Sequence, residues 1–316
     1  MKMSIRCIIF SLLTFLLYSG CALEAPQPSG RAYVYGVSRY ENLKDLDFTD
    51  DDARDMAALF SNAGYEAKLR IDDGTEAGTG PATIEQLEKD IEEFITGSTP
   101  GELFVFYFAG HGGRYDEIYS SGLPEPPPGV EPSQGEGGDE WLFFSGSIPS
   151  LSYETWTDVA LKDDELALML SEIPGGMKLV IIDACKSGGF IGDSTFVDPL
   201  PQGPDDADPQ MFWESLFAYF GFSEEAAKDI AGGNAFVLTA AGELENSAEI
   251  NGNGVFTLAF LEAAANGDID ENGYITLHEI YRYIEETWED RPLTSGFHPH
   301  LSGSAVDIVL FSHLPQ

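Results

Sequence analysis

Basic residues are scarce in this chain. It holds 16 lysines and arginines against 54 aspartates and glutamates in 316 residues, which gives a formal net charge of −38. So negative a surface repels phosphate groups, and neither nucleic acid nor an anionic lipid surface is expected as a partner. Cationic peptides and divalent cations are favoured instead. Most of the acidic side chains are expected to lie on a solvated surface.

Long apolar runs are rare as well, and one of them opens the chain. The sequence begins MKMSIRCIIFSLLTFLLYSGCALEAP, with Lys2 and Arg6 ahead of an apolar run and small residues behind it. This layout is typical of a secretory signal peptide and is too short for a stable membrane span. Residues 1–20 are therefore predicted to direct export, and residues 21–30 to form a Pro/Ser/Gly-containing linker.

Cysteine is almost absent. With only Cys7, Cys21 and Cys185, the chain has no disulfide scaffold, although export usually leads to an oxidising compartment. The stretch LYSGC that ends at Cys21 resembles a bacterial lipobox, which implies lipidation of Cys21 and a membrane-anchored lipoprotein facing the periplasm or the cell exterior. Tyr18 departs from that pattern, and a plain cleaved signal is the alternative. Since Cys7 is lost with the signal, Cys185 remains as either a small buried hydrophobic residue or a reactive thiol.

From residue 31 onward, strand-like apolar runs alternate with segments of helical period. Strands are expected in RAYVYGVS, YEAKLRI, ELFVFYFAG, KLVIIDA, NAFVLTAA and AVDIVLFS. The first helix is expected to follow Thr49 as its N-cap. Because strands and helices alternate, residues 31–312 are predicted to form one α/β domain with a mostly parallel six-stranded sheet. Two insertions, residues 119–138 and 191–232, interrupt the pattern.

Two of the apolar strands lead into reactive residues. The run FVFYFAGHGG delivers His111, and VIIDACKSGG delivers Cys185. Because ligands bind beyond the carboxyl ends of parallel strands, neighbouring strands are expected to bring the imidazole and the thiol to one rim. The histidine can then generate a thiolate and later protonate a leaving amine. The amides of Gly112 and Cys185 are the expected donors to an oxyanion. The competing interpretation is a buried cysteine beside a surface histidine.

These residues resemble the caspase-like cysteine peptidases, and among them the bacterial metacaspases and paracaspases. FYFAGHGG is similar to the histidine motif of that family and IIDACKSGG to its cysteine motif. AYVYGVSRYENL, DDARDM, NAFVLTAAGELENSAEINGNGVFTLAFLEA and HPHLSG are similar to further family segments, in the same order. The resemblance implies a three-layer caspase-hemoglobinase sandwich and an endopeptidase with Cys185 as nucleophile and His111 as base. It also implies that a backbone carbonyl orients the base. Lys186 stands where metacaspases usually have histidine.

An acidic pocket is expected beside this dyad. Asp183 closes an apolar strand two residues before Cys185, and a buried carboxylate needs either a cation or several hydrogen-bond donors. The resemblance implies that Asp183 lines the primary specificity pocket with Asp52 and Glu249 and binds Arg or Lys. Asp51 competes with Asp52 for this assignment. Peptide or protein substrates with basic residues are therefore the expected partners.

A further acidic motif lies near the C-terminal end. DIDENGYITLHE, residues 268–279, satisfies the pattern of an EF-hand calcium loop. The predicted calcium ligands are Asp268, Asp270, Asn272, Tyr274, Thr276 and Glu279. Ca²⁺ is thus expected as a structural or regulatory ion, whereas the His/Cys chemistry requires no cofactor. The alternative is a turn whose helix cap only resembles the loop.

Two other functions would use the same residues. A peptide ligase would employ the dyad for acyl transfer to an amine. An idle calcium-binding or adhesion lipoprotein would keep the scaffold without the chemistry. The presence of both His111 and Cys185 favours the enzyme.

Overall fold

The structure is a computed structural model. It describes residues 30–41, 43–114, 140–146, 158–174, 177–186, 235–240, 249–250, 253–288, 300–303 and 307–312. The predicted signal peptide, Cys21 and both predicted insertions lie outside the described residues.

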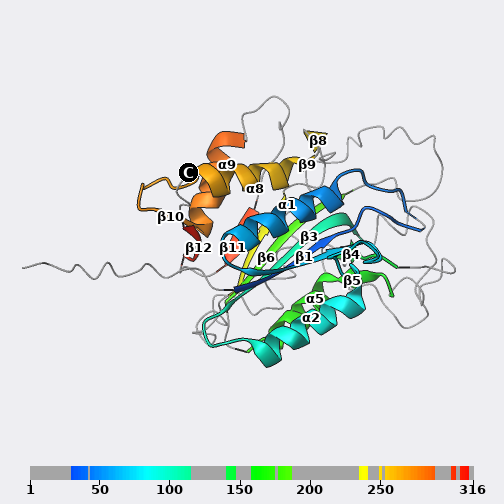
Figure 1. Ribbon diagram of the computed structural model, residues 1–316. Helices are drawn as coiled ribbons and strands as arrows, with labels where there is room; N and C mark the ends of the chain where they lie inside the picture. Colours follow the sequence, from blue (N-terminus) through cyan, green and yellow to red (C-terminus); the bar gives the residue numbers. More distant parts are fainter. Residues whose placement is uncertain are drawn as a thin grey trace, which may run out of the picture.

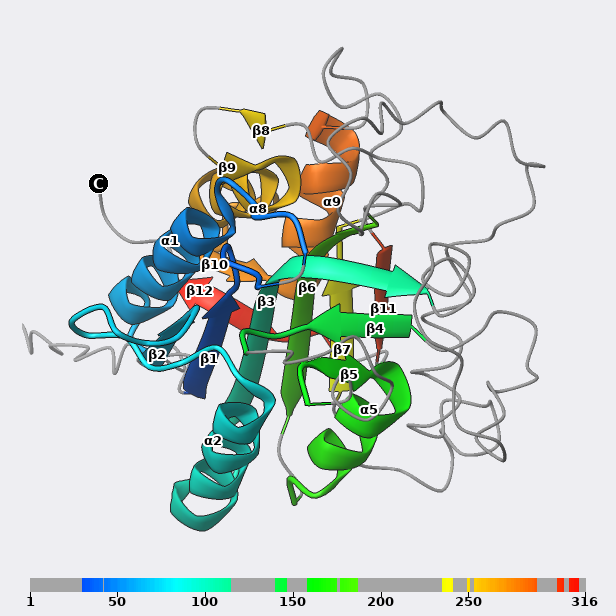
Figure 2. The same cartoon turned by 90° about the vertical axis from the view of Figure 1, so that its right-hand side faces the viewer.

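A mostly parallel sheet forms the middle layer of the molecule (Figure 1). In spatial order its main path consists of β11 (His300–Gly303), β7 (Ala235–Thr239), β6 (Lys178–Lys186), β3 (Leu103–Arg114), β1 (Gly30–Gly36) and β2 (Glu66–Ile71). Only β11 runs antiparallel to its neighbour on this path. Figure 2 shows β4 (Glu140–Phe143) antiparallel to the end of β3, with β5 (Ala160–Lys162) paired to β4. The predicted mostly parallel sheet is confirmed. Its main path has six strands, but β4 and β5 bring the sheet of the described residues to eight, so the predicted count of six strands was too low.

Helices cover both faces of the sheet, which gives three layers (Figures 1 and 2). One face is covered by α1 (Thr49–Asn62), α8 (Val255–Asn266) and α9 (Leu277–Trp288), and the other by α2 (Ile84–Gly97) and α5 (Asp163–Ser171). None of the described helices is long and apolar enough to cross a membrane.

Strand β3 is buried on both faces, as its continuous apolar run predicts. Val105 and Tyr107 belong to the core cluster under α1 and α8, whereas Phe104 and Phe106 belong to the cluster under α2 and α5. All four side chains are fully buried. The period of two thus assigns alternate residues of β3 to opposite layers.

Two local predictions were wrong. The helix α1 begins at Thr49 itself, because the Thr49 hydroxyl donates to the Val37 carbonyl oxygen at 2.7 Å instead of capping the helix. The segment AVDIVLFS supplies β12 (Val309–Ser312), which pairs outside the main sheet with β10 (Tyr274–Thr276). The packing explains this position, since Phe311 lies 5.7 Å from the Phe60 ring of α1. The edge strand of the main sheet is β11 instead.

A buried ion pair ties α2 to two strands. Asp90 of α2 is fully buried and accepts hydrogen bonds from Arg70 of β2, from Nε at 2.8 Å and from Nη2 at 2.6 Å. The hydroxyl of Tyr35 on β1 donates to Asp90 Oδ2 at 2.7 Å, and Gln86 Nε2 donates to Oδ1 at 2.9 Å. Every carboxylate oxygen is therefore satisfied, as a buried charge requires.

Removing the Asp90 carboxylate should destabilise the fold strongly. Asp90→Ala leaves the Arg70 guanidinium without its buried counter-ion, and we expect the free energy of unfolding to fall by about 3–5 kcal/mol in urea denaturation. Lys89→Ala is the matched control, because it breaks an exposed pair with Glu85 on the same helix and should change little. Equal stability of the two variants would contradict the assigned role of the pair.

Candidate active site

His111 and Cys185 lie on neighbouring strands. In the parallel pairing of β3 with β6, His111 is the Cα partner of Cys185, and Gly112 is the partner of Lys186. Both strands run further than the apolar pattern indicates, since β3 continues to Arg114 and β6 to Lys186. The end of β3 pairs with β4 from Gly112 onward, and the end of β6 pairs with β3 up to Lys186. The backbone thus brings the predicted base and nucleophile together at one end of the sheet.

The His111 ring is held by a backbone carbonyl. Its Nε2 lies 2.7 Å from the Lys44 carbonyl oxygen, and the side chain is buried. Because a carbonyl oxygen only accepts, Nε2 carries the proton of the neutral ring, and Nδ1 is the basic nitrogen. Burial lowers the pKa of His111 to about 4. The imidazole is therefore neutral at pH 7, as a general base must be.

Tyr40 supports the same histidine from the loop after β1. Its hydroxyl oxygen accepts a hydrogen bond from the His111 backbone N–H at 2.9 Å, and the two ring centroids are 4.6 Å apart. Gly110 makes this approach possible, since a Cβ there would lie 2.8 Å from the Tyr40 hydroxyl and from the Phe108 ring. Tyr40 and the Lys44 carbonyl escape sequence reasoning. The former belongs to no motif with an evident chemical role, and the latter acts through its backbone.

Two aspartates fix the loop that carries these groups. Asp72 Oδ1 accepts from the backbone N–H of Ser38 at 2.7 Å and of Arg39 at 3.0 Å. Asp45 Oδ1 accepts from the Tyr40 N–H at 2.9 Å. These bonds hold the loop against the ring of His111.

Asp52 and Asp183 cap the N-terminus of α8. The Gly254 N–H donates to Asp52 Oδ1 at 2.9 Å, while Thr257 donates to Asp183 Oδ2 through its N–H at 3.3 Å and its hydroxyl at 2.6 Å. The N-cap residue, Gly254, has no side chain of its own to do this. Both carboxylates are buried, at 2% and 6% relative exposure. The positive end of the helix dipole favours negative charge at this position.

The two carboxylates share one small space. A Cβ built on Gly254 would lie 3.0 Å from Asp52 Oδ2 and 3.1 Å from Asp183 Oδ2, so a larger residue there would push the two carboxylates aside. Burial raises the pKa of both carboxyls, and the charge of Asp183 adds to the effect on Asp52. In the part of the chain that the structure describes, no Lys or Arg forms an ion pair with either. Such a pair favours either a proton or an incoming cation.

Glu249 joins this group through its backbone. The strand β8 (Glu249–Ile250) pairs with β9 (Asn253–Gly254), and Glu249 is the Cα partner of Gly254. The backbone therefore brings position 249 next to the glycine that Asp52 and Asp183 contact. Asp51 does not belong to the group, because its side chain is 54% exposed and lies 3.8 Å from Arg54.

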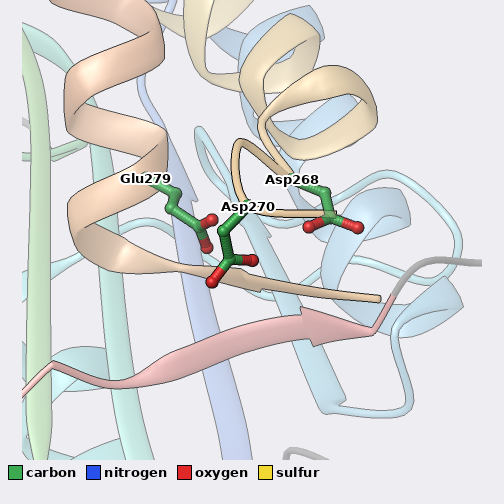
Figure 3. A group of neighbouring side chains, drawn as sticks. All are labelled: Asp268, Asp270 and Glu279. Atoms are coloured by element: carbon green, nitrogen blue, oxygen red, sulfur yellow. The ribbon is translucent and has the colours of Figure 1, made fainter. Parts of the chain in front are cut away.

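The predicted calcium loop places three carboxylates together. Asp268 and Asp270 lie on the loop after α8, and Glu279 lies on the first turn of α9 (Figure 3). One oxygen from each lies within 4.8 Å of the others. Gly273 has a φ of +86°, and its N–H donates to Asp268 Oδ2 at 2.9 Å. The sharp turn that the EF-hand pattern requires at this glycine is therefore present.

Of the remaining predicted ligands, Asn272 lies on the same loop, whereas Tyr274 and Thr276 lie on β10. Asn272 Oδ1 accepts from the Tyr274 N–H at 2.8 Å, and the Thr276 hydroxyl donates to Glu279 Oε2 at 3.0 Å. The six predicted ligand residues therefore span the loop, β10 and the first turn of α9, and their three carboxylates come together. Oxygen donors of this kind fit Ca²⁺.

Comparison with known proteins identifies the family. The family model described as the caspase domain matches residues 29–287. Metacaspase-1 from Arabidopsis thaliana is 26% identical over 253 residues, a stretch that covers 76% of this chain and 61% of that relative. The crystal structure of protein GSU0716 from Geobacter sulfurreducens aligns with a TM-score of 0.53 and 18% identity, covering 88% of this chain and 94% of the other, and it supports the fold alone. The chain belongs to the caspase-domain family of peptidases.

Proposed function

We propose that this protein is a cysteine endopeptidase that cleaves peptide or protein substrates after Arg or Lys. One observation carries the specificity. Two buried carboxylates, Asp52 and Asp183, meet at Gly254 without a cation from the described residues. Asp183 lies on the same strand as Cys185, two residues before it. Family membership and the pairing of His111 with Cys185 support the chemistry.

The proposed reaction is acyl transfer through a thioester. Nδ1 of His111 takes the thiol proton, and the Cys185 thiolate attacks the carbonyl carbon of the scissile peptide bond. The amides of Gly112 and Cys185 donate to the oxyanion. The imidazolium then protonates the amine as the C–N bond breaks, and water, deprotonated by His111, hydrolyses the thioester. The Lys44 carbonyl orients the ring, so the dyad needs no third acid.

The pocket acids supply the selectivity. A guanidinium or ammonium group between Asp52 and Asp183 would replace the proton that the pair otherwise retains. We propose Glu249, whose backbone pairs with Gly254, as the third acid of the pocket. An aspartate side chain would add a like charge to the pair, which is unfavourable in a buried site. The site thus favours basic and rejects acidic residues.

Two further properties belong to the proposal. The N-terminal sequence supports export and anchoring through a lipidated Cys21. The convergence of Asp268, Asp270 and Glu279 supports a calcium site that stabilises the C-terminal part of the domain. A single loop of this kind is expected to bind calcium weakly, near the extracellular end of the affinity range.

Cleavage specificity tests the main proposal. In fluorogenic peptides that differ only in the residue before the cleaved bond, Arg and Lys should be accepted and Asp should not. Asp183→Asn should cost about 2–4 kcal/mol in transition-state stabilisation, measured as kcat/KM, because a buried cation loses its counter-ion. Asp51→Asn is the matched control and should retain activity, and Cys185→Ala should have none. Preferential cleavage after Asp would refute the proposed specificity.

The carboxylate pair should also reduce stability as the pH rises. An unfolded aspartate loses its proton near pH 4, whereas the raised pKa of Asp52 keeps the folded form protonated to higher pH. The folded state then binds more protons, so the free energy of unfolding falls with rising pH. We expect Asp52→Asn to remove this loss and to stabilise the protein by about 1–3 kcal/mol at pH 8 in urea denaturation.

The gain in Asp52→Asn should shrink toward pH 5, where the wild-type carboxyl is protonated in the folded state. Asp51→Asn changes a half-exposed neighbouring residue and should show little of this gain in stability. A lower stability of Asp52→Asn at pH 8 would show that the buried charge is satisfied in the free protein.

Calcium should stabilise the mature protein. We expect millimolar Ca²⁺ to raise the melting temperature by several degrees, because an ion that binds only the folded state shifts the unfolding equilibrium. Glu279→Gln should remove most of the gain, since a carboxylate ligand is lost. Glu286→Gln on the same helix changes an exposed residue outside the loop and should keep it. An unchanged melting temperature of the wild type in calcium would reject the site.

A further inference from the structure

Three buried polar side chains form a continuous series of hydrogen bonds that ends at Asp183. The Tyr107 hydroxyl of β3 lies 2.5 Å from Thr257 Oγ1 of α8, and Thr257 Oγ1 lies 2.6 Å from Asp183 Oδ2 of β6. Tyr107 and Thr257 are fully buried. The catalytic steps described above use neither of these hydroxyl groups.

The hydrogens of this chain have a direction. An ionised Asp183 can only accept, so the single hydroxyl hydrogen of Thr257 points to Asp183 Oδ2. The Thr257 oxygen is then the acceptor for the hydroxyl hydrogen of Tyr107. Each hydroxyl thus polarises the next in a site of low dielectric, which strengthens the bond to the carboxylate.

Both Thr257 donors contact the same oxygen. Its N–H, at 3.3 Å, and its hydroxyl, at 2.6 Å, approach Asp183 Oδ2. Two donors on one oxygen fix the orientation of the carboxylate, and Oδ1 has no hydrogen-bond donor among the described residues. In the proposal below, Oδ1 is the oxygen that accepts from the cationic side chain of a substrate.

We propose that Thr257, supported by Tyr107, is a positioning residue that keeps Asp183 ionised and correctly oriented to bind the basic side chain of the substrate. This assignment rests on the proposed function. It makes selectivity depend on two uncharged residues that do not themselves touch the substrate.

The titration of Asp183 should respond to the loss of these donors. Donors to the charged form lower the pKa of a carboxyl, and both Thr257 bonds act in that direction against the burial of Asp183. The other titratable groups at this place are Asp52 from α1, Glu249 on β8 and the Tyr107 phenol from β3. Among these carboxyls the Thr257 hydroxyl bonds only to Asp183, so a shift of the pH dependence would report on Asp183 and, through the charge of Asp183, on Asp52.

Benzamidine, an arginine-like cation, tests the proposal without catalysis. The parent protein is the mature Cys185→Ala variant, and each further substitution is added to it. Benzamidine binding to the parent and to each double variant is measured by calorimetry between pH 5 and pH 8. Thr257→Val preserves the shape and the backbone donor but removes the hydroxyl, whereas Thr257→Ser retains the hydroxyl. Tyr107→Phe removes only the outer donor. Tyr35→Phe is the matched control, because it removes a buried tyrosine hydroxyl bonded to Asp90 on the other face of the sheet.

We expect Thr257→Val to weaken benzamidine binding about tenfold at pH 7, as for the loss of a hydrogen bond to a charged group. The pH at which binding fails should move upward. Tyr107→Phe should show a smaller loss, and Thr257→Ser and Tyr35→Phe should bind like the parent. In active enzyme, Thr257→Val should raise KM for Arg peptides more than it lowers kcat.

The outcomes separate the two proposals. Equal binding by parent and Thr257→Val, with the same pH dependence, would overturn the positioning role and leave the proposed specificity intact. If Thr257→Val does not fold, the same comparison of the parent with Tyr107→Phe decides. No benzamidine binding by the parent at any pH would overturn the proposed basic specificity and this assignment with it.

Discussion

The parallel pairing of β3 with β6 is the constraint on which the site depends. Both strands are buried on their two faces, so their register cannot slip by one residue without exchanging the two core layers. In the observed register, Asp183 lies on the face toward α8 and bonds with Thr257. A slip would turn it toward the layer that contains Phe108 and Phe144, where aromatic rings pack together. The same register makes His111 the partner of Cys185.

The Asp52–Asp183 pair illustrates how a fold can bury two carboxyl groups without a basic partner among the described residues. The start of α8 supplies amides to Asp52 and Asp183, and the helix dipole adds a favourable field. Asp90, in the opposite layer, is neutralised by Arg70 at hydrogen-bonding distance. The contrast is informative, because the chain has few basic residues and uses one of them at Asp90 but none of the described ones at the pocket. A buried carboxylate pair of this kind is suited to binding a cation from outside.

The sequence predicts well those features that the residues of one short segment determine by themselves. The apolar runs of β3 and β6 indicate buried central strands. The EF-hand pattern lies within twelve residues, and the structure brings its three carboxylates together. What it misses depends on contacts between distant segments. Thr257 is 74 residues from Asp183 in the chain, and the Lys44 carbonyl is 67 residues from His111. The segment 305–312 has a strand pattern, but only tertiary packing determines which sheet it joins.

The helix α8 lies between the two acidic clusters of the domain, the Asp52–Asp183 pair and the 268–279 loop, and its dipole acts differently on each. At its N-terminus, Asp52 and Asp183 lie at the positive end of the dipole, which stabilises their charge. At its C-terminus, Asn266, the acidic loop begins two residues later with Asp268, at the negative end of the same dipole. Carboxylates are unfavourable there unless a cation accompanies them. Glu279 is partly compensated because it lies in the first turn of α9. The same helix therefore favours anionic side chains at its start and a cation beside the acidic loop at its end.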